Sequence, residues 1–247
     1  MKALAVIPAR YASTRFPVKA LANLAGKPII QHVYERVVAS ALFTDVIIAT
    51  DHQAIMDAVK AFHGKAMMTS DKHQSGSDRI AEVLKHYPET DVIVNVQGDE
   101  PLIERQPLAD LLQAFNDPFV DMASLMTPIT DPEMLSDPNI VKVVTNSQGD
   151  AIYFSRSCVP YNRDDKEHTY YRHIGVYAYR PDVLEEFVSL PQGTLEQIEK
   201  LEQLRALEHD IPIRMVITEY QGVGIDTPAD LDRVEKLLEA QQQGSIA

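Results

Sequence analysis

Residues 92–100 read VIVNVQGDE, a short apolar run that ends in a glycine followed by two carboxylates. The run does not alternate between apolar and polar residues, which is typical of a strand buried on both faces of a parallel sheet. Further runs of this kind are found at Ala3–Ile7, Val46–Ala49 and Met122–Met126. The chain therefore repeats a buried strand at intervals long enough to hold a helix between successive strands.

The segments between these runs carry apolar residues three and four positions apart, as amphipathic helices do. We expect helices at Pro28–Ser40, Gln53–Phe62, Ser77–His86 and Gln106–Phe115. Strands that alternate with helices form βαβ units. The sequence therefore predicts the α/β class, with a Rossmann-like, mostly parallel sheet flanked by helices.

The regular alternation of strands and helices ends at about Asp131. Strands without regular helices between them are expected at Ile140–Val144, Ala151–Phe154 and Gly175–Tyr179, and helices are expected again at Leu195–Leu207 and Ala229–Ala240. Asp226 or Thr227 can cap the last helix, because Pro228 suits its first turn. We expect one part at about residues 1–130 and 210–247, and a smaller β-rich lobe at about residues 131–209.

The composition excludes several classes of protein. The chain has 247 residues, with 23 Lys and Arg against 36 Asp and Glu, so its formal net charge is −13. Nucleic-acid binding needs a basic face, and this charge argues against it. A single cysteine, Cys158, excludes an intrachain disulfide framework. No segment approaches the roughly 20 apolar residues of a membrane span, so we expect no membrane partner and a cytoplasmic protein.

The loop after the first strand is basic although the protein is acidic. Residues 7–28 read IPARYASTRFPVKALANLAGKP and place Arg10, Arg15 and Lys19 close together, around the small residues 12–14. Ligands of open α/β sheets bind beyond the carboxyl ends of strands, so an anion site is expected here, with a solvated basic loop as the alternative. The loop matches neither the P-loop nor the dinucleotide-binding pattern.

Carboxylates follow two apolar runs. Asp99 and Glu100 directly follow the segment at residues 92–98, and Asp226 lies in VGIDTP before the last helix. Asp99 and Asp226 can meet at one edge of the sheet, and such oxygen ligands suit Mg²⁺ that also binds phosphates. An acidic turn without a catalytic role is the alternative.

The segment DKHQSGSDRIAEV places Ser75, Gly76 and Ser77 before a helix and Arg79 in its first turn. An arginine opposes the helix dipole at this position, so we expect it to contact a ligand. The alternative is that Ser75 or Ser77 only caps the helix.

Several blocks, taken in chain order, resemble one family. They are IPARYASTRFP, ATDH, HQSGSDRIAEV, VNVQGDEPLI, NIVKVV, YFSRSCVPYNRD, RHIGVYAYR, LEQLRALE and GVGIDTPADL. Together they resemble the 3-deoxy-manno-octulosonate cytidylyltransferases, or CMP-Kdo synthetases, from Met1 to Leu238. The family transfers CMP from CTP to Kdo, an eight-carbon sugar acid of bacterial lipopolysaccharide, and releases pyrophosphate.

The resemblance implies a single nucleotidyltransferase domain over residues 1–247, of the nucleotide-diphospho-sugar transferase type, that acts as a cytoplasmic homodimer with Mg²⁺. Its larger part would bind the nucleotide, and its β-rich lobe would bind the sugar and form the dimer interface. CTP would contact Arg10, Ser13, Lys19, Ser75, Gly76, Ser77, Arg79 and Gln97. Mg²⁺ would bind Asp99 and Asp226, which with Arg10 and Lys19 form the catalytic set. The sugar acid would contact Gln97, Arg156, His173, Tyr177, Glu202 and Gln203, with Arg156 and His173 suited to its carboxylate and hydroxyls.

One departure from the family pattern lies in the phosphate loop. The family usually has Gly-Lys-Pro where this chain has Val18-Lys19-Ala20. If the backbone there needs a positive φ, a β-branched valine is strained by roughly 1 to 3 kcal/mol.

Three other functions remain open at this point. The same reaction on the 8-amino analogue of Kdo differs in one substituent of the substrate. Transfer to N-acylneuraminate agrees mainly with the first block alone. A non-catalytic nucleotide-binding protein should lack a carboxylate or the basic loop, yet Arg10, Lys19, Asp99 and Asp226 are all present.

Overall fold

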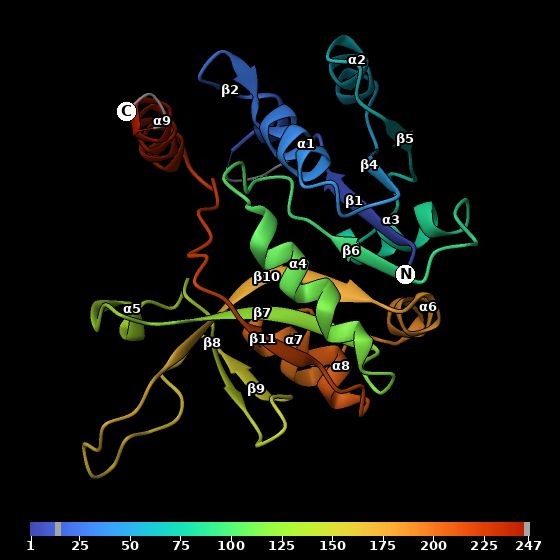
Figure 1. The fold of residues 1–247 in the computed structure, drawn as a ribbon. Coiled ribbons are helices and arrows are strands. Elements are labelled where there is room, and N and C mark those ends of the chain that lie inside the picture. The colour runs from blue at the N-terminus through green and yellow to red at the C-terminus, as the bar shows by residue number, and fades with distance from the viewer. Residues whose placement is uncertain (13–15, 245–247) are drawn as a thin grey trace. The chain divides into compact units, whose positions relative to one another are not determined.

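The computed structural model of the chain describes residues 1–12 and 16–244 and divides it into two compact units. Unit 1 comprises Met1–Gln106 and Gly222–Ala247, and unit 2 comprises Pro107–Gln221. Ser13, to which the sequence assigned a phosphate contact, lies outside the described residues. Figure 1 labels the elements of both units.

Unit 1 contains a parallel sheet whose strands are ordered β6-β1-β4-β5. The strands are β1 (Ala3–Ala9), β4 (Asp45–Thr50), β5 (Ala66–Met68) and β6 (Val92–Asn95). Their helices are α1 (Ile29–Ala39), α2 (Gln53–Ala61) and α3 (Gly76–Leu84). The side chains of residues 92–95 are buried, as a strand covered on both faces requires. The predicted α/β class and its parallel sheet are confirmed here.

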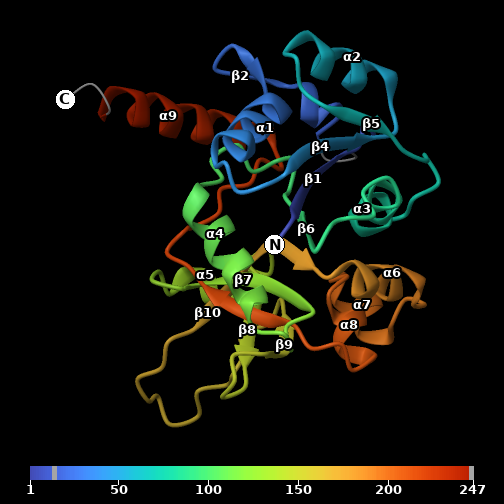
Figure 2. The same cartoon turned by 45° about the vertical axis from the view of Figure 1, so that its right-hand side comes forward.

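A second core of unit 1 joins the two ends of the chain (Figure 2). The 3₁₀ helix η1 (Lys19–Leu21) and the hairpin of β2 (Asn23–Leu24) and β3 (Lys27–Pro28) precede α1. The C-terminal helix α9 (Pro228–Gly244) follows Thr227. Leu24 and Ile29 pack with Ile225 and Val234 in one buried cluster. This cluster is what holds the C-terminal segment in unit 1.

Unit 2 is the β-rich part of the chain. Its strands are β7 (Met122–Pro128), β8 (Lys142–Thr145), β9 (Ala151–Ser155), β10 (Tyr171–Tyr179) and β11 (Arg214–Ile217). Pairing is antiparallel from β7 to β10, from β10 to β8 and from β8 to β9, and parallel only from β11 to β7. The predicted smaller β-rich lobe is thereby confirmed.

The helices of unit 2 differ from the expectation, because two of them were not predicted and one predicted helix is divided. They are α4 (Arg105–Gln113, which begins in unit 1), η2 (Ala114–Asn116), α5 (Glu133–Ser136), α6 (Pro181–Ser189), α7 (Thr194–Glu199) and α8 (Leu204–Glu208). The two helices that were not predicted are α5 and α6. The single helix expected at Leu195–Leu207 is wrong, because it is two short helices. Lys200 adopts a left-handed conformation with φ 56°, which ends α7.

The boundary between the units also differs from the expected one. β7 was expected to close the larger part, at about residue 130, but it belongs to unit 2. The reason is its pairing, since β10 and β11 flank β7 and both come from later in the chain. An apolar run predicts a buried strand but does not predict which strands pair with it. None of the helices among the described residues is long and apolar enough to cross a membrane.

Candidate active site

Lys19 lies between two carboxylates in unit 1. Its Nζ donates to Asp99 Oδ2 at 2.5 Å and to Asp226 Oδ1 at 3.1 Å. The lysine side chain is 17% exposed. Burial alone would lower the pKa of Lys19, but the two carboxylates outweigh burial and raise it. Lys19 therefore stays protonated, and the cluster carries two negative charges against one positive charge.

The loop after β6 places Asp99 because the preceding residue has no side chain. A Cβ on Gly98 would lie 2.8 Å from the backbone oxygen of Pro8 and 3.3 Å from Ile30 Cδ1. Real Cβ atoms essentially never approach a backbone oxygen this closely. Gly98 thus lets the loop pass tightly over the end of β1, and Asp99 follows at the carboxyl end of the sheet.

Asp226 reaches the same place from the other end of the chain. The backbone N–H of Ile225 donates to the carbonyl of Asp99 at 3.0 Å, and the Ile225 side chain is fully buried. Thr227 caps α9, since its Oγ1 accepts from the Asp230 N–H and its own N–H donates to the Asp230 carboxylate. Of the two expected capping residues, Thr227 is therefore the one that caps. The Asp226 carboxylate turns to Lys19 instead.

Val18 has φ 55° and ψ 30°, which is the left-handed region. The positive φ on which the expected strain of Val18 depends is therefore present. A β-branched residue in this region is strained by about 1 to 3 kcal/mol. The Val18 carbonyl accepts the Leu21 N–H at 2.9 Å, so the conformation closes the short helix that contains Lys19.

Arg10 connects the first loop to the turn before α3. Its Nη2 donates to the carbonyl of Gln74 at 2.6 Å. A backbone carbonyl carries no net charge, so this bond leaves the positive charge of Arg10 uncompensated. The predicted anion site thus has a fixed cation beside the turn that contains Ser75 and Gly76.

The turn before α3 caps the helix, which was the alternative to a ligand contact. Ser75 Oγ accepts from the Asp78 N–H, and the Asp78 carboxylate accepts from the Ser75 N–H, which is a capping box. Ser77 is buried. Capping does not exclude a second contact with a nucleotide, so the roles assigned to Ser75, Gly76 and Ser77 stay predictions.

Arg79 is buried and forms an ion pair with Asp51. Its Nη2 donates to Asp51 Oδ2 at 2.9 Å and its Nη1 donates to Thr69. Burial lowers the pKa of Arg79, although Asp51 opposes this effect. The interaction joins α3 to the ends of β4 and β5. A direct contact with cytidine stays a prediction, as does the contact assigned to the half-buried Gln97.

Arg156 in unit 2 is held by backbone carbonyls. Its Nε donates to the Glu199 carbonyl and its Nη1 to the Pro138 carbonyl, each at 2.8 Å. These acceptors orient the guanidinium, and they do not neutralise it. The arrangement agrees with the predicted contact to a carboxylate.

His173 and Tyr177 lie together on β10, with ring centroids 5.2 Å apart. Burial lowers the pKa of His173 to about 3, so its imidazole is neutral. Burial also raises the pKa of Tyr177 well above its usual value, with the nearby Glu202 adding to the effect. A neutral ring offers hydrogen bonds and no charge, so the carboxylate contact assigned to His173 stays a prediction. Its suitability for hydroxyls is unaffected.

Glu202 and Gln203 lie between α7 and α8. Gln203 is the residue before α8 and is buried, and Glu202 Oε1 lies 3.8 Å from Arg205 Nη2. Arg205 also forms two bonds, of 2.8 and 2.7 Å, with the Glu196 carboxylate. This buried pair fixes the turn that carries both predicted residues.

Two buried polar residues near these groups were not singled out from the sequence. Ser124 lies on β7 and contacts His173, and Lys142 lies on β8 and contacts the Arg156 carbonyl. Both interrupt apolar runs, MASLM and NIVKVV, and a polar residue inside a buried strand needs a partner. That interruption is the signal by which they could have been found.

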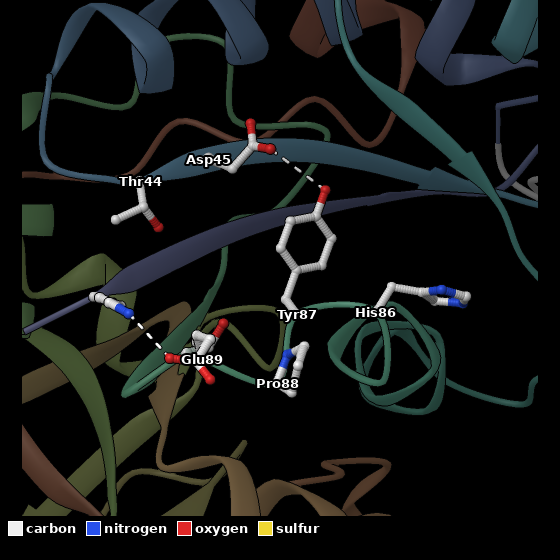
Figure 3. Close-up of a pocket in the computed structure, with 8 residues that line it drawn as sticks. Thr44, Asp45, His86, Tyr87, Pro88 and Glu89 are labelled. Carbon is white, nitrogen blue, oxygen red and sulfur yellow. Dashed lines mark hydrogen bonds and ion pairs between the residues drawn. The ribbon is translucent and has the colours of Figure 1, made fainter.

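A cavity of about 450 Å³ lies elsewhere in unit 1 (Figure 3). Its lining includes Lys2, Thr44, Tyr87 and Thr90, which are next to the amino ends of β1, β4 and β6 or to the segment before them. Asp99 is at the opposite, carboxyl end of these strands. Ligands of open α/β sheets bind at the carboxyl end, so this cavity is not the candidate active site.

The described residues contain no group of three or more His, Cys, Asp or Glu side chains that could hold a metal ion. Mg²⁺ commonly binds through one or two carboxylates, with phosphate and water oxygens completing its shell. Asp99 and Asp226 fit this pattern, because both direct an oxygen to one cationic nitrogen. The donor set is therefore suited to Mg²⁺ in the presence of a triphosphate.

Comparison with known proteins agrees with this chemistry. A family model described as cytidylyltransferase matches residues 4–213. The 3-deoxy-manno-octulosonate cytidylyltransferase of Solibacter usitatus is 49% identical, over 97% of this chain and 95% of its own length. The enzyme of the same name from Flavobacterium johnsoniae is 50% identical, over 96% of this chain and 99% of its own.

Solved structures show the same pattern. The CMP:2-keto-3-deoxy-manno-octonic acid synthetase complexed with CTP superposes with a TM-score of 0.93 at 46% identity, over 98% of this chain and 100% of that one. The 4-diphosphocytidyl-2C-methyl-D-erythritol synthase of Anaerococcus prevotii, at 15% identity and a TM-score of 0.65 over 96% of this chain and 99% of that one, shares the fold alone.

Proposed function

Because the chain belongs to the 3-deoxy-manno-octulosonate cytidylyltransferase family, we propose that it transfers CMP from CTP to Kdo and releases pyrophosphate. The observation that carries this proposal is an identity of 49 to 50% with enzymes of that name over nearly the full length of both chains. The cluster of Lys19, Asp99 and Asp226 supports it, since a phosphate-transfer site needs both a cation and carboxylates that bind one.

Unit 1 binds CTP. Arg10 and Lys19 contact the phosphates, and their positive charge offsets the repulsion between a triphosphate and a chain of net charge −13. Ser75, Gly76, Ser77, Arg79 and Gln97 bind the cytidine side. The backbone of the turn at residues 75–77 is held by the α3 capping box, so its position is set before the nucleotide arrives.

Asp99 and Asp226 would hold Mg²⁺ together with the phosphates of CTP. When bound, the ion supplies charge neutralisation for the triphosphate and for the pyrophosphate that leaves. Lys19 would then donate to a phosphate oxygen, because the carboxylates that hold its ammonium would be occupied by the ion. Gly98 and the Ile225 N–H keep both carboxylates in place for this exchange of partners.

Unit 2 binds the sugar acid. Arg156 contacts the carboxylate of Kdo, because its charge is not neutralised by the carbonyls that orient it. His173, Tyr177, Glu202 and Gln203 bind the hydroxyls. The anomeric oxygen attacks the α-phosphorus of CTP in line and its proton passes to water, while the bond between the α-phosphorus and the oxygen bridging to the β-phosphorus breaks and pyrophosphate leaves. The protein contributes orientation and charge stabilisation to this step.

Pyrophosphate release by the purified protein tests the proposal. CTP and Mg²⁺ are supplied with Kdo, its 8-amino analogue or N-acetylneuraminate in parallel, and CTP or metal is omitted as a control. Release with Kdo that EDTA abolishes is the expected result. Faster release with the 8-amino analogue favours that substrate. Release with none of the three, from folded protein that binds CTP, contradicts the transferase proposal.

We also propose that the product serves lipopolysaccharide biosynthesis in the cytoplasm and that the enzyme is a homodimer formed through residues 131–179. The exposed side chains of Ile152 and Tyr161 support this interface, as does β9, which pairs only with β8 among the named strands. Light scattering at the mass of two chains is expected, and the mass of one chain contradicts the dimer.

A further inference from the structure

A bulge in β10 separates His173 from Tyr177. Ile174 pairs with Leu125 and Tyr177 pairs with Ser124, so Gly175 and Val176 lie between two pairs that are adjacent on β7. Bulges of this kind redirect side chains and are frequent beside active sites. The bulge breaks the regular backbone pairing with β7, and the Ile174 and Val176 carbonyls lie within hydrogen-bond distance of a side chain of that strand.

Ser124 fills the bulge with its hydroxyl. The Oγ atom lies 2.9 Å from the Val176 carbonyl oxygen, 3.3 Å from the Ile174 carbonyl oxygen and 2.9 Å from His173 Nε2. The residue is fully buried, so water does not replace any of these contacts. The single hydroxyl of Ser124 therefore lies within hydrogen-bond distance of three polar atoms.

Proton counting decides the direction of these bonds. A hydroxyl has one hydrogen, and a carbonyl oxygen can only accept. If Ser124 donated to His173, two carbonyl oxygens would face its lone pairs without a hydrogen between them. Ser124 therefore donates to a carbonyl in the bulge, and His173 donates its Nε2–H to Ser124. Burial keeps the ring neutral, so Nδ1 then carries a lone pair and no proton.

We propose that Ser124 is a positioning residue that fixes His173 in its Nε2–H tautomer and thereby makes Nδ1 a hydrogen-bond acceptor for a hydroxyl of the sugar acid. This inference rests on the proposed function for the identity of the ligand. The tautomer itself rests only on the contacts of Ser124. Phe154, whose ring meets the His173 ring edge to face at 5.1 Å, holds the imidazole from another side.

The tautomer is measured directly by NMR of protein labelled with ¹⁵N in histidine, because a protonated and an unprotonated ring nitrogen have well-separated shifts. His173→Gln assigns the signal. The wild-type protein should show a protonated Nε2 and an unprotonated Nδ1. In Ser124→Ala, the Nδ1–H form should appear. A wild-type ring with Nδ1–H overturns the proposal, whether or not the protein has transferase activity.

Kinetics test the consequence. Loss of one oriented hydrogen bond predicts that Ser124→Ala raises the KM for Kdo about 10-fold and leaves the KM for CTP unchanged. Ser124→Thr keeps the hydroxyl and should restore much of the affinity. Ser40→Ala is the matched control, because Ser40 is also buried and its hydroxyl donates to the Val37 carbonyl in unit 1. Equal changes in both KM values, or equal effects at Ser40, contradict the positioning role.

A pair of substitutions at His173 keeps the test independent of Ser124. Asparagine places an acceptor near the position of Nδ1, and glutamine places its amide near the position of Nε2. His173→Asn should therefore retain more affinity for Kdo than His173→Gln. The opposite order overturns the proposal. If the wild-type protein turns over none of the sugar acids, the proposed function fails, and the NMR result still decides the tautomer.

Discussion

One partly buried lysine in unit 1 and one buried lysine in unit 2 have opposite surroundings. Lys19 in unit 1 donates to two carboxylates, and its pKa is raised because they outweigh burial. Lys142 in unit 2 is fully buried and donates to the carbonyls of Asp137, Ile140 and Arg156 at 2.6 to 3.0 Å. Burial lowers its pKa, and the neighbouring Arg156 adds to this effect.

The two lysines differ in whether their partners can release them. Carboxylates that hold a lysine can exchange it for another cation, so the Lys19 cluster can reorganise when a triphosphate binds. Carbonyl groups belong to the backbone and cannot leave, so Lys142 ties the segment before β8 to the end of β9. That tie also fixes the backbone of Arg156, whose side chain is assigned to the sugar acid.

The largest effect is expected at the carboxylates. Asp99→Asn and Asp226→Asn should each lower kcat by about 100-fold or more, because a neutral amide binds Mg²⁺ poorly and no longer balances Lys19. Initial rates of pyrophosphate release at saturating CTP and Kdo measure this. Asp57→Asn, an exposed acid on α2, is the control and should keep the wild-type rate. Near-wild-type turnover of either variant removes that residue from the metal site.

Lys142→Met should lower the free energy of unfolding by about 2 kcal/mol, because three partly buried carbonyls lose the ammonium that donates to all of them. Urea denaturation followed by circular dichroism measures the change. Lys65→Met removes an exposed lysine that pairs with Asp45, and its cost should stay below about 1 kcal/mol. Equal costs for the two variants would show that the carbonyl contacts of Lys142 contribute little.

Val18→Gly should raise the free energy of unfolding by about 1 kcal/mol, because glycine adopts the left-handed region without strain and gives back only part of the gain as chain entropy. Ala25→Gly is the matched control, since Ala25 also has a positive φ, 48°, but is not β-branched. Its gain should be smaller. A destabilised Val18→Gly protein contradicts strain at this position.

The smallest expected difference between the two lysines is in how their contributions to the free energy of unfolding change at alkaline pH. The pKa of Lys142 is lowered from 10.5, so between its folded and unfolded pKa values the unfolded chain holds more protons, and its contribution to stability rises with pH up to about 10.5. The pKa of Lys19 is raised, so its contribution falls as pH rises above about 10.5. The free energy of unfolding is measured by urea denaturation in EDTA across this pH range. Its rise with pH should be absent in Lys142→Met, and its fall with pH should be absent in Lys19→Met. Unchanged pH profiles in both variants contradict the opposite shifts.

The sequence by itself predicted the local elements and the chemical types. Mostly apolar runs identified β1, β4, β6 and β7, because a strand covered on both faces leaves few polar positions. The blocks of the family resemblance identified the cytidylyltransferase, and the valine before Lys19 predicted the strained position that has φ 55°. These features depend on neighbours in the chain, so the sequence contains them.

The sequence predicted that Asp99 and Asp226 meet at one edge of the sheet, but only the tertiary structure decided how they meet and which other groups join them. Asp99 and Asp226 share one ammonium because Gly98 passes over Pro8 and Ile225 is buried with residues from the other end of the chain. Desolvation of the His173 ring lowers its pKa to about 3, and its hydrogen-bond partner is Ser124 because a bulge shifts the register of β10 on β7. A pKa, a tautomer and a strand partner depend on atoms that are distant in sequence and close in space, and local patterns carry no information about them.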